Sequence, residues 1–177
     1  MQKNTKITVQ ILLGATVIAS FAQITYTINL SNLSIPVTGQ SLAVVLIASF
    51  LGAQNGTVAV LIYLLLGLLG LPVFAGASGG LEVLKSGSMG FLFGFLPTAY
   101  CSGYLESKNK NNNFFRRFLG LLFVTALLFF CGVAWLAMKY DVQTALKYGF
   151  FPLVGGAIIK LFLASSIIFV TKKYYFK

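Results

Sequence analysis

One lysine lies inside a stretch of otherwise uncharged, mostly apolar residues. Residues 155–170 read GGAIIKLFLASSIIFV, and Lys160 is the charged residue among them. A charge at the centre of a transmembrane helix costs about 2.5–3.5 kcal/mol on insertion scales, so such a lysine usually faces a cavity or a partner. We favour a non-protein anion, a ligand carboxylate, as the counter-ion of Lys160.

Two other interpretations of Lys160 are snorkelling to the membrane surface and an internal salt bridge. Lys160 is eight residues past Pro152 and eleven before Thr171, so roughly 12 Å or more of helix separates it from either end. That is far for one side chain, although fraying at Gly155 and Gly156 would bring outside water closer. No acidic residue is expected at the same depth, which disfavours the salt bridge.

The ionisable residues exclude the common catalytic centres. The chain has no histidine, three acidic residues and two cysteines, and Cys101 and Cys131 fall in different apolar segments. Histidine-based triads and clusters of metal ligands cannot be assembled from this set. Glu82, Glu106 and Asp141 fall in loops or at helix ends, and the sequence has no GxxxxGK[ST] phosphate loop. We therefore expect no enzymatic activity and no metal or cofactor.

The overall composition is that of an integral membrane protein. Hydrophobic residues make up 58% of the chain and charged residues 9%, and the mean hydropathy is +0.88. Soluble proteins are roughly 45–50% apolar and about 25% charged. Because a transmembrane helix needs about 20 residues, 177 residues hold about six spans and no separate soluble domain. We expect an all-α integral membrane protein, folded as a compact bundle of six transmembrane helices.

The apolar segments divide a single transmembrane domain, residues 1–177, into six expected spans. They cover residues 7–28, 41–52, 57–71, 89–105, 114–138 and 151–171. The turn GAQNG separates the second span from the third, and the dipeptide LP ends the third. These two spans are short, so we expect tilted or partly buried helices.

The basic residues indicate how the chain is oriented. With six spans, both termini share one side of the membrane with nine basic residues: Lys3, Lys6, Lys108, Lys110, Arg116, Arg117, Lys172, Lys173 and Lys177. The other side has Lys85, Lys139 and Lys147. The positive-inside rule then places both termini in the cytoplasm of a multi-pass protein in a prokaryotic cell membrane. A single helix in place of the second and third spans would put the loop KNKNNNFFRR outside, so six spans fit better.

The first apolar segment has two alternative interpretations. Lys3 and Lys6, followed by an apolar run and then Ser20-Phe21-Ala22, also fit a cleaved signal peptide. We favour retention, because the apolar character continues to Ile28 and removal would leave an odd number of spans.

Small side chains line one face of this segment. Ala15, Ala19 and Ala22 recur at helical spacing, with Gly14 beside them. A smooth face of this kind lets another helix approach closely. It fits either docking to a partner subunit or ordinary packing inside the chain's own bundle.

Two loops on the expected outer side could complete a binding site with Lys160. SIPVTGQS combines a proline-fixed turn with the hydroxyl of Thr38 and the amide of Gln40. FAGASGG, which ends in Gly79 and Gly80, offers backbone that a ligand can approach closely. These features predict a pocket that faces outward.

Several of these segments together resemble a known family. They are IPVTGQSLAVVLIASFLG, AVLIYLLLGLLGLPVFAGASGG and GFLFGF. They are similar to the substrate-binding (S) component of energy-coupling-factor vitamin transporters, in the biotin-specific BioY family. The likeness covers nearly all of residues 36–104 and returns at residues 152–164.

The resemblance implies a function and the partners that go with it. It implies a six-helix membrane protein that captures biotin from outside and is not an enzyme. Release would occur while the protein is docked on a transmembrane coupling subunit driven by two ATPases. The docking face would be the small-residue face of the first helix, and the loop between the first two helices would act as a lid.

The resemblance also suggests roles for side chains. Lys160 would pair with the valerate carboxylate of biotin or hydrogen-bond its ureido group. The apolar rings and chain of biotin would lie among Tyr63, Phe74 and Phe91, although aromatic residues in such a protein are more often packing or interface anchors.

Two departures from the family pattern concern ligand contacts. The family has an aspartate three residues before the lysine, where this chain has Ala157, and it tends to read GPTGGY where residues 86–91 read SGSMGF. A relative that binds thiamine or riboflavin is therefore one alternative. A membrane scaffold or channel subunit with a structural Lys160 is another.

Overall fold

The computed structural model describes residues 2–30 and 33–175. The helices are α1 (Gln2–Ala22), α2 (Gln40–Leu68), α3 (Met89–Lys108), α4 (Phe114–Lys139), α5 (Val142–Gly149) and α6 (Phe151–Tyr175). Two strands, β1 (Thr25–Leu30) and β2 (Leu33–Thr38), and two short 3₁₀ helices, η1 (Ala75–Ala77) and η2 (Leu81–Lys85), complete the described chain.

Within the described residues, four helices are long and apolar enough to cross a membrane. They are α1 from Asn4 onward, α2, α4 and α6 up to Tyr174. These helices make the protein a multi-pass membrane protein.

The longest helix, α2, contains a sharp reversal at Gly52. Gly52 has φ 82° and ψ 171°, which is not helical. A Cβ placed on Gly56 would lie 2.5 Å from the Cα of Ala48, whereas residues eight apart in a straight helix are about 12 Å apart. The chain therefore folds back on itself here, at the first residue of the GAQNG turn. With α2 taken as two segments, the described chain has six long helical segments and the short α5.

The segment after α1 is a β-hairpin and not a continuation of the helix. The structure ends α1 at Ala22, whereas the expected first span ran to residue 28. β1 and β2 are antiparallel, with Thr25 opposite Thr38 and Thr27 opposite Pro36. Thr25, Tyr26 and Thr27 favour extended backbone, because β-branched and aromatic side chains fit a pleated surface. The hairpin is thus an addition to the expected all-helical fold.

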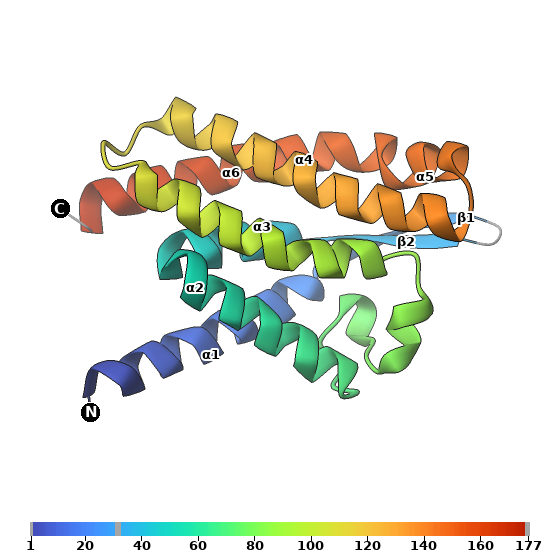
Figure 1. Ribbon diagram of the computed structural model, residues 1–177, viewed down its shortest axis with the longest axis horizontal. Coiled ribbons are helices and arrows are strands. Elements are labelled where there is room, and N and C mark those ends of the chain that lie inside the picture. The colour runs from blue at the N-terminus through green and yellow to red at the C-terminus, as the bar shows by residue number, and fades with distance from the viewer. Residues whose placement is uncertain (1, 31–32, 176–177) are drawn as a thin grey trace.

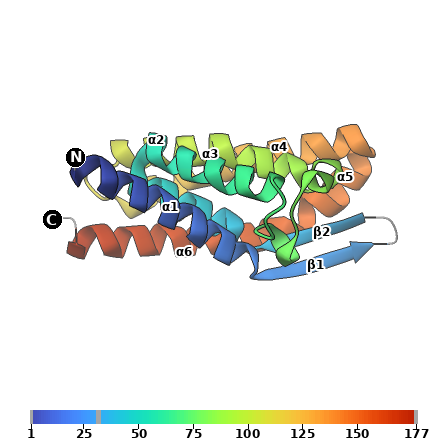
Figure 2. The same ribbon diagram turned by 90° about the horizontal axis from the view of Figure 1, so that it is seen from below.

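The two ends of the molecule differ in what they contain. Figures 1 and 2 show the N and C termini together at one end and the hairpin, η2 and α5 toward the other. We call these the terminal end and the hairpin end. At the hairpin end α5 begins after Asp141, whose carboxylate accepts the Thr144 backbone N–H at 2.8 Å. Hydrogen bonding from the side chain of Thr144, together with this backbone bond, lowers the pKa of Asp141.

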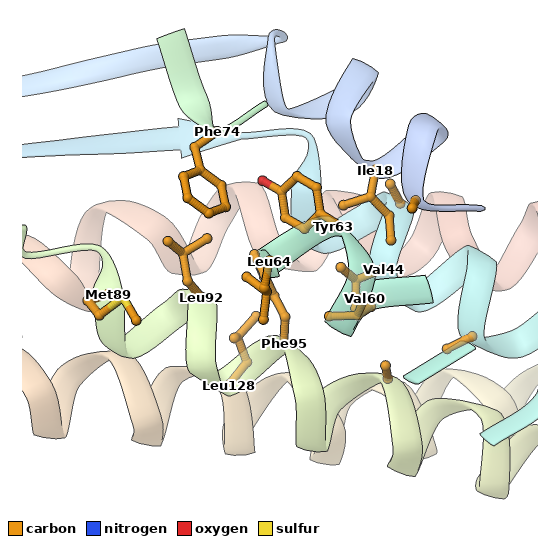
Figure 3. Close-up of a cluster of buried hydrophobic side chains, with 14 residues drawn as sticks. Ile18, Val44, Val60, Tyr63, Leu64, Phe74, Met89, Leu92, Phe95 and Leu128 are labelled. Atoms are coloured by element: carbon orange, nitrogen blue, oxygen red, sulfur yellow. The ribbon is translucent and has the colours of Figure 1, made fainter. Parts of the chain in front are cut away.

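The main core lies where α1, both halves of α2, α3 and α4 meet. Figure 3 shows side chains from these helices converging on one cluster, with Tyr63 and Phe74 at its edge. Ile18, Val44 and Val60 are fully buried within it. The core holds α1 and α2 against the α3–α4 pair and so supports the inner wall of the pocket described below.

A buried ion cluster joins three helices at the terminal end. Arg117 of α4 donates from Nε and Nη2 to the two carboxylate oxygens of Glu106 of α3, each at 2.8 Å. Lys172 of α6 lies 2.9 Å from the same carboxylate. The side chains of Arg117 and Glu106 are 1% and 3% exposed, so the pair is shielded from solvent. Glu106 lies near the C-terminal end of α3, consistent with the expected position in a loop or at a helix end, but its burial was not expected.

Candidate functional site

A pocket of about 350 Å³ lies beside the base of the hairpin. Its walls come from the end of β2, the start of α2, the loop that contains η1 and η2, and the helices α3, α4 and α6. Most of the lining side chains are apolar, and Phe91, Phe95 and Phe129 supply aromatic surface. A concave, largely apolar site with a few polar groups is typical of small-molecule binding.

Lys160 of α6 brings a cationic group into this pocket. Its Nζ donates to the backbone carbonyl of Thr38 at 2.6 Å and lies 3.4 Å from the hydroxyl of Ser41. Both partners are neutral, and among the described residues no carboxylate forms an ion pair with Lys160. Glu82 also lines the pocket but forms no ion pair with Lys160, so the direct partners of the ammonium are dipoles and not a charge.

Thr38 and Gln40 connect the lysine to the core through side-chain hydrogen bonds. The Thr38 hydroxyl donates to Oε1 of Gln40 at 2.7 Å. Nε2 of Gln40 donates to the hydroxyl of Tyr63, and the Tyr63 ring packs edge-on against Phe74, with centroids 5.4 Å apart. The polar side of the pocket is thus a continuous network from α6 to the second half of α2.

The structure brings most of the predicted site residues together. The lining includes six of them: Thr38, Gln40, Phe74, Gly79, Phe91 and Lys160. Ala157, one turn before Lys160, also lines the pocket with its methyl group.

Two predicted contacts do not line the pocket. Tyr63 is completely buried behind Gln40 and Phe74, so it supports the wall from the core. Gly80 has φ 88° and precedes η2, and its N–H donates to the carbonyl of Gly67 at 2.7 Å. Its role is to fasten the loop to α2, because a backbone N–H that is already bonded is not free for a ligand.

The structure corrects the prediction of a docking face at Ala15, Ala19 and Ala22. Ala15 is 4% exposed, Ala22 is fully buried and Ala19 packs against the main core. Gly14, beside them, contacts Ile47 of α2. The small residues let α1 approach α2 within this chain, which is the other interpretation of their spacing.

Sequence reasoning missed Gln23, beside the pocket, and several polar residues of the lining: Ser41, Ser78, Glu82, Ser86, Ser88 and Thr125. Ser41 lines the pocket next to Lys160. Gln23 follows α1 and bonds the loop that forms one wall: its Nε2 donates to the carbonyl of Phe74 at 3.2 Å, and its Oε1 accepts the N–H of Ala77 at 3.0 Å. Isolated serine and glutamine residues at helix ends are common, so neither Ser41 nor Gln23 had a distinguishing signal.

A bundle of membrane-length helices that encloses an apolar pocket with one cationic group defines a membrane-embedded binding protein for a small molecule. Comparison with known sequences gives the particular family. The sequence matches the BioY family over residues 1–176, and the chain belongs to that family.

The individual relatives cover most of the chain. It is 39% identical over 142 residues to the Biotin transporter BioY of Thermotoga maritima, covering 78% of this chain and 82% of the relative. It is 38% identical over 160 residues to the Biotin transporter BioY2 of Lactococcus lactis subsp. cremoris, covering 88% and 84%. The crystal structure of the S-component for biotin from an ECF-type ABC transporter superposes with a TM-score of 0.86 at 25% identity, over 97% of this chain and 93% of that one.

Proposed function

We propose that this protein is the biotin-capturing S component of an energy-coupling-factor transporter and uses the pocket beside Lys160 as its ligand site. Membership of the BioY family and the likeness to the biotin S-component support biotin as the ligand. The protein captures biotin for uptake across the cell membrane and performs no chemistry on it.

The uncompensated charge of Lys160 is the observation that supports the pocket as the ligand site. Biotin joins an apolar bicyclic ring and chain to a carboxylate, and the pocket joins apolar walls to one ammonium whose protein partners are neutral. A carboxylate that reached Lys160 would form a charge-assisted hydrogen bond, which is shorter and stronger than a neutral one. The Ser41 hydroxyl, 3.4 Å from Nζ of Lys160, would lie beside the same carboxylate.

The orientation and the partners form part of the same proposal. The terminal end, where most of the basic residues lie, would face the cytoplasm, and the hairpin end with the pocket would face outward. Transport would then require a transmembrane coupling subunit and ATPase subunits, because this chain has no nucleotide-binding motif of its own.

Calorimetric titration in detergent tests the function and the role of Lys160 together. Biotin should bind the wild-type protein, and thiamine should not. Biotin methyl ester, which lacks the negative charge, should bind roughly 10- to 100-fold more weakly, as expected for loss of a hydrogen bond between charged groups. Lys160→Ala should weaken biotin to a similar extent, and the ester should then bind the variant about as well as biotin does.

Lys147→Ala is the matched control, because Lys147 is an exposed lysine of α5 outside the pocket. It should bind biotin like the wild type. Equal affinity for biotin and its ester would contradict a carboxylate contact at Lys160. Failure of the folded wild-type protein to bind biotin would contradict the proposed function.

A further inference from the structure

One wall of the pocket is a strained turn. The turn runs from Phe74 to Ser78 and is closed by a hydrogen bond from the Phe74 N–H to the Ser78 carbonyl at 3.0 Å. Ala77 has φ 55°, a left-handed value that a residue with a Cβ rarely adopts. Phe74, Ala75 and Ser78 line the pocket, so the shape of the wall depends on this turn staying in place.

Gln23 bonds both sides of the turn. Its Oε1 accepts the N–H of the strained Ala77, and its Nε2 donates to the carbonyl of Phe74 at the start of the turn. Nε2 also donates to the carbonyl of Ala19 at 3.2 Å, which ties the side chain to the last turn of α1. A single amide therefore joins the end of α1 to the pocket wall.

The same end of α1 also contacts a second part of the pocket wall. The carbonyl of Ile24 accepts the N–H of Gly39 at 3.0 Å, and a Cβ on Gly39 would lie 2.8 Å from the Phe21 carbonyl. Gly39 stands between Thr38 and Gln40, the polar side of the pocket. Both parts of the wall thus take their position from residues 21–24.

We propose that Gln23 is a positioning residue of the binding pocket: it holds the turn of residues 74–78 in its strained form and so keeps a bound ligand from leaving. Gln23 is exposed and does not line the pocket, so it acts through Phe74 and Ala77. Strained backbone persists where surrounding contacts determine it. Inside the turn these contacts are the Phe74–Ser78 backbone bond and the Ser78 hydroxyl, which donates to the Ala75 carbonyl at 2.8 Å. From outside the turn, the Gln23 side chain adds its bonds to Phe74 and Ala77. The proposal rests on the pocket being the biotin site.

Gln23→Met tests this, because methionine has a similar length and forms neither hydrogen bond. Backbone amide hydrogen exchange of residues 75–79 is measured in the ligand-free protein, and biotin dissociation is measured from the loaded protein. Both rates should rise roughly tenfold, as expected for the loss of two hydrogen bonds, while association changes less. The thermal midpoint should shift little, because the change is on the surface.

Ser20→Ala is the control on the same helix end, since within the described part of the chain the Ser20 hydroxyl bonds the Thr16 carbonyl of its own helix and no other group. It should leave exchange and dissociation at wild-type values. Unchanged exchange in Gln23→Met would show that the turn is ordered without Gln23 and would overturn the proposal. So would raised exchange with unchanged biotin dissociation.

The design separates the two proposals. If the wild-type protein binds no biotin, the proposed function is contradicted, and so is the proposal that Gln23 slows biotin dissociation. The exchange of residues 75–79 would still decide whether Gln23 positions the turn. Gln23→Ala, measured in parallel, should behave like Gln23→Met if the lost hydrogen bonds cause the effect.

Discussion

The side-chain amide of Gln40 is buried between two hydroxyl groups at the first residue of α2. It accepts from Thr38 and donates to Tyr63, and Thr38 also offers its carbonyl to Lys160. A hydrogen-bond network of this kind fixes the direction of each member through its neighbours. A change at Tyr63 therefore reaches the pocket although Tyr63 does not line it.

Tyr63→Phe should lower both stability and affinity for biotin. It leaves Nε2 of Gln40 without its acceptor in the core, and an unsatisfied buried polar group costs about 1–3 kcal/mol. Thermal unfolding in detergent and calorimetric titration with biotin measure the two effects. Tyr100→Phe, at a tyrosine of α3 that is 51% exposed, should change neither. Wild-type values for Tyr63→Phe would contradict the role of this network.

Among the site residues, the sequence predicts those that differ from their surroundings. It does not predict polar residues of a type and position that are common in any helical protein. Lys160, Thr38 and Gln40 could be predicted as neighbours because a lone charge in an apolar helix and a polar turn on the same side stand out. Gln23 could not, because its partner Ala77 is 54 residues away. Tyr63 was expected to contact the ligand but lies behind the pocket wall. The sequence of a helix that is apolar all round does not indicate which face an aromatic residue occupies.

Gly52 determines the form of α2, the longest helix. Its backbone has φ 82° and ψ 171°, a region open essentially to glycine alone. The reversal lets the second half of α2 return beside the first, and Gly56 then fits against Ala48. Because of the reversal, the first half of α2 places Gln40 in the pocket wall, and the second half places Tyr63 directly behind it.

Gly52→Ala should destabilise the protein by about 1–3 kcal/mol, because a Cβ strains this backbone conformation. The cost is conformational and not steric, since a Cβ there meets nothing within 4 Å. Gly155→Ala is the matched control: its Cβ also meets nothing within 4 Å, but Gly155 is helical, where alanine is favoured by roughly 1 kcal/mol. Thermal unfolding of both variants measures the difference. Equal midpoints would contradict the reversal at Gly52.

The hairpin shows where sequence reasoning about elements failed. Apolar residues continue past Ala22, so hydropathy alone extended the first span to Ile28. The alternative signal was present in Thr25, Tyr26 and Thr27, whose side chains favour strands. The continuous apolar run outweighed this strand preference in the prediction. Strands this short show too few alternations of apolar and polar residues to be distinguished from the end of a transmembrane helix.

Across the whole molecule, an ion cluster joins the helices at the terminal end, whereas loops and the hairpin join them at the hairpin end. Glu106, Arg117 and Lys172 join α3, α4 and α6 at the terminal end. The family likeness and the six long segments could be predicted from residues 36–104 and from composition. The ion cluster could not, because Glu106 and Arg117 lie at the ends of different expected spans and meet only when α3 and α4 pack side by side.

Glu106→Gln should lower the free energy of unfolding by about 3–5 kcal/mol, because it leaves the buried Arg117 without its carboxylate. Thermal and denaturant unfolding in detergent measure this. Lys110→Gln, at an exposed lysine in the loop between α3 and α4, should have a small effect. A double variant Glu106→Gln with Arg117→Met should recover part of the loss, and failure to recover any would contradict pairing as the source of the stability.

The way the hairpin is attached has a consequence for the stability of the pocket wall. Two strands alone are marginally stable in water, and the hairpin is fastened near its base, where Lys160 holds Thr38 and Ile24 holds Gly39. Local stability therefore falls along the strands away from the base. The hairpin residues that line the pocket are Pro36, Val37 and Thr38, at this base. Local opening of the outer strand residues would therefore leave this part of the pocket wall in place.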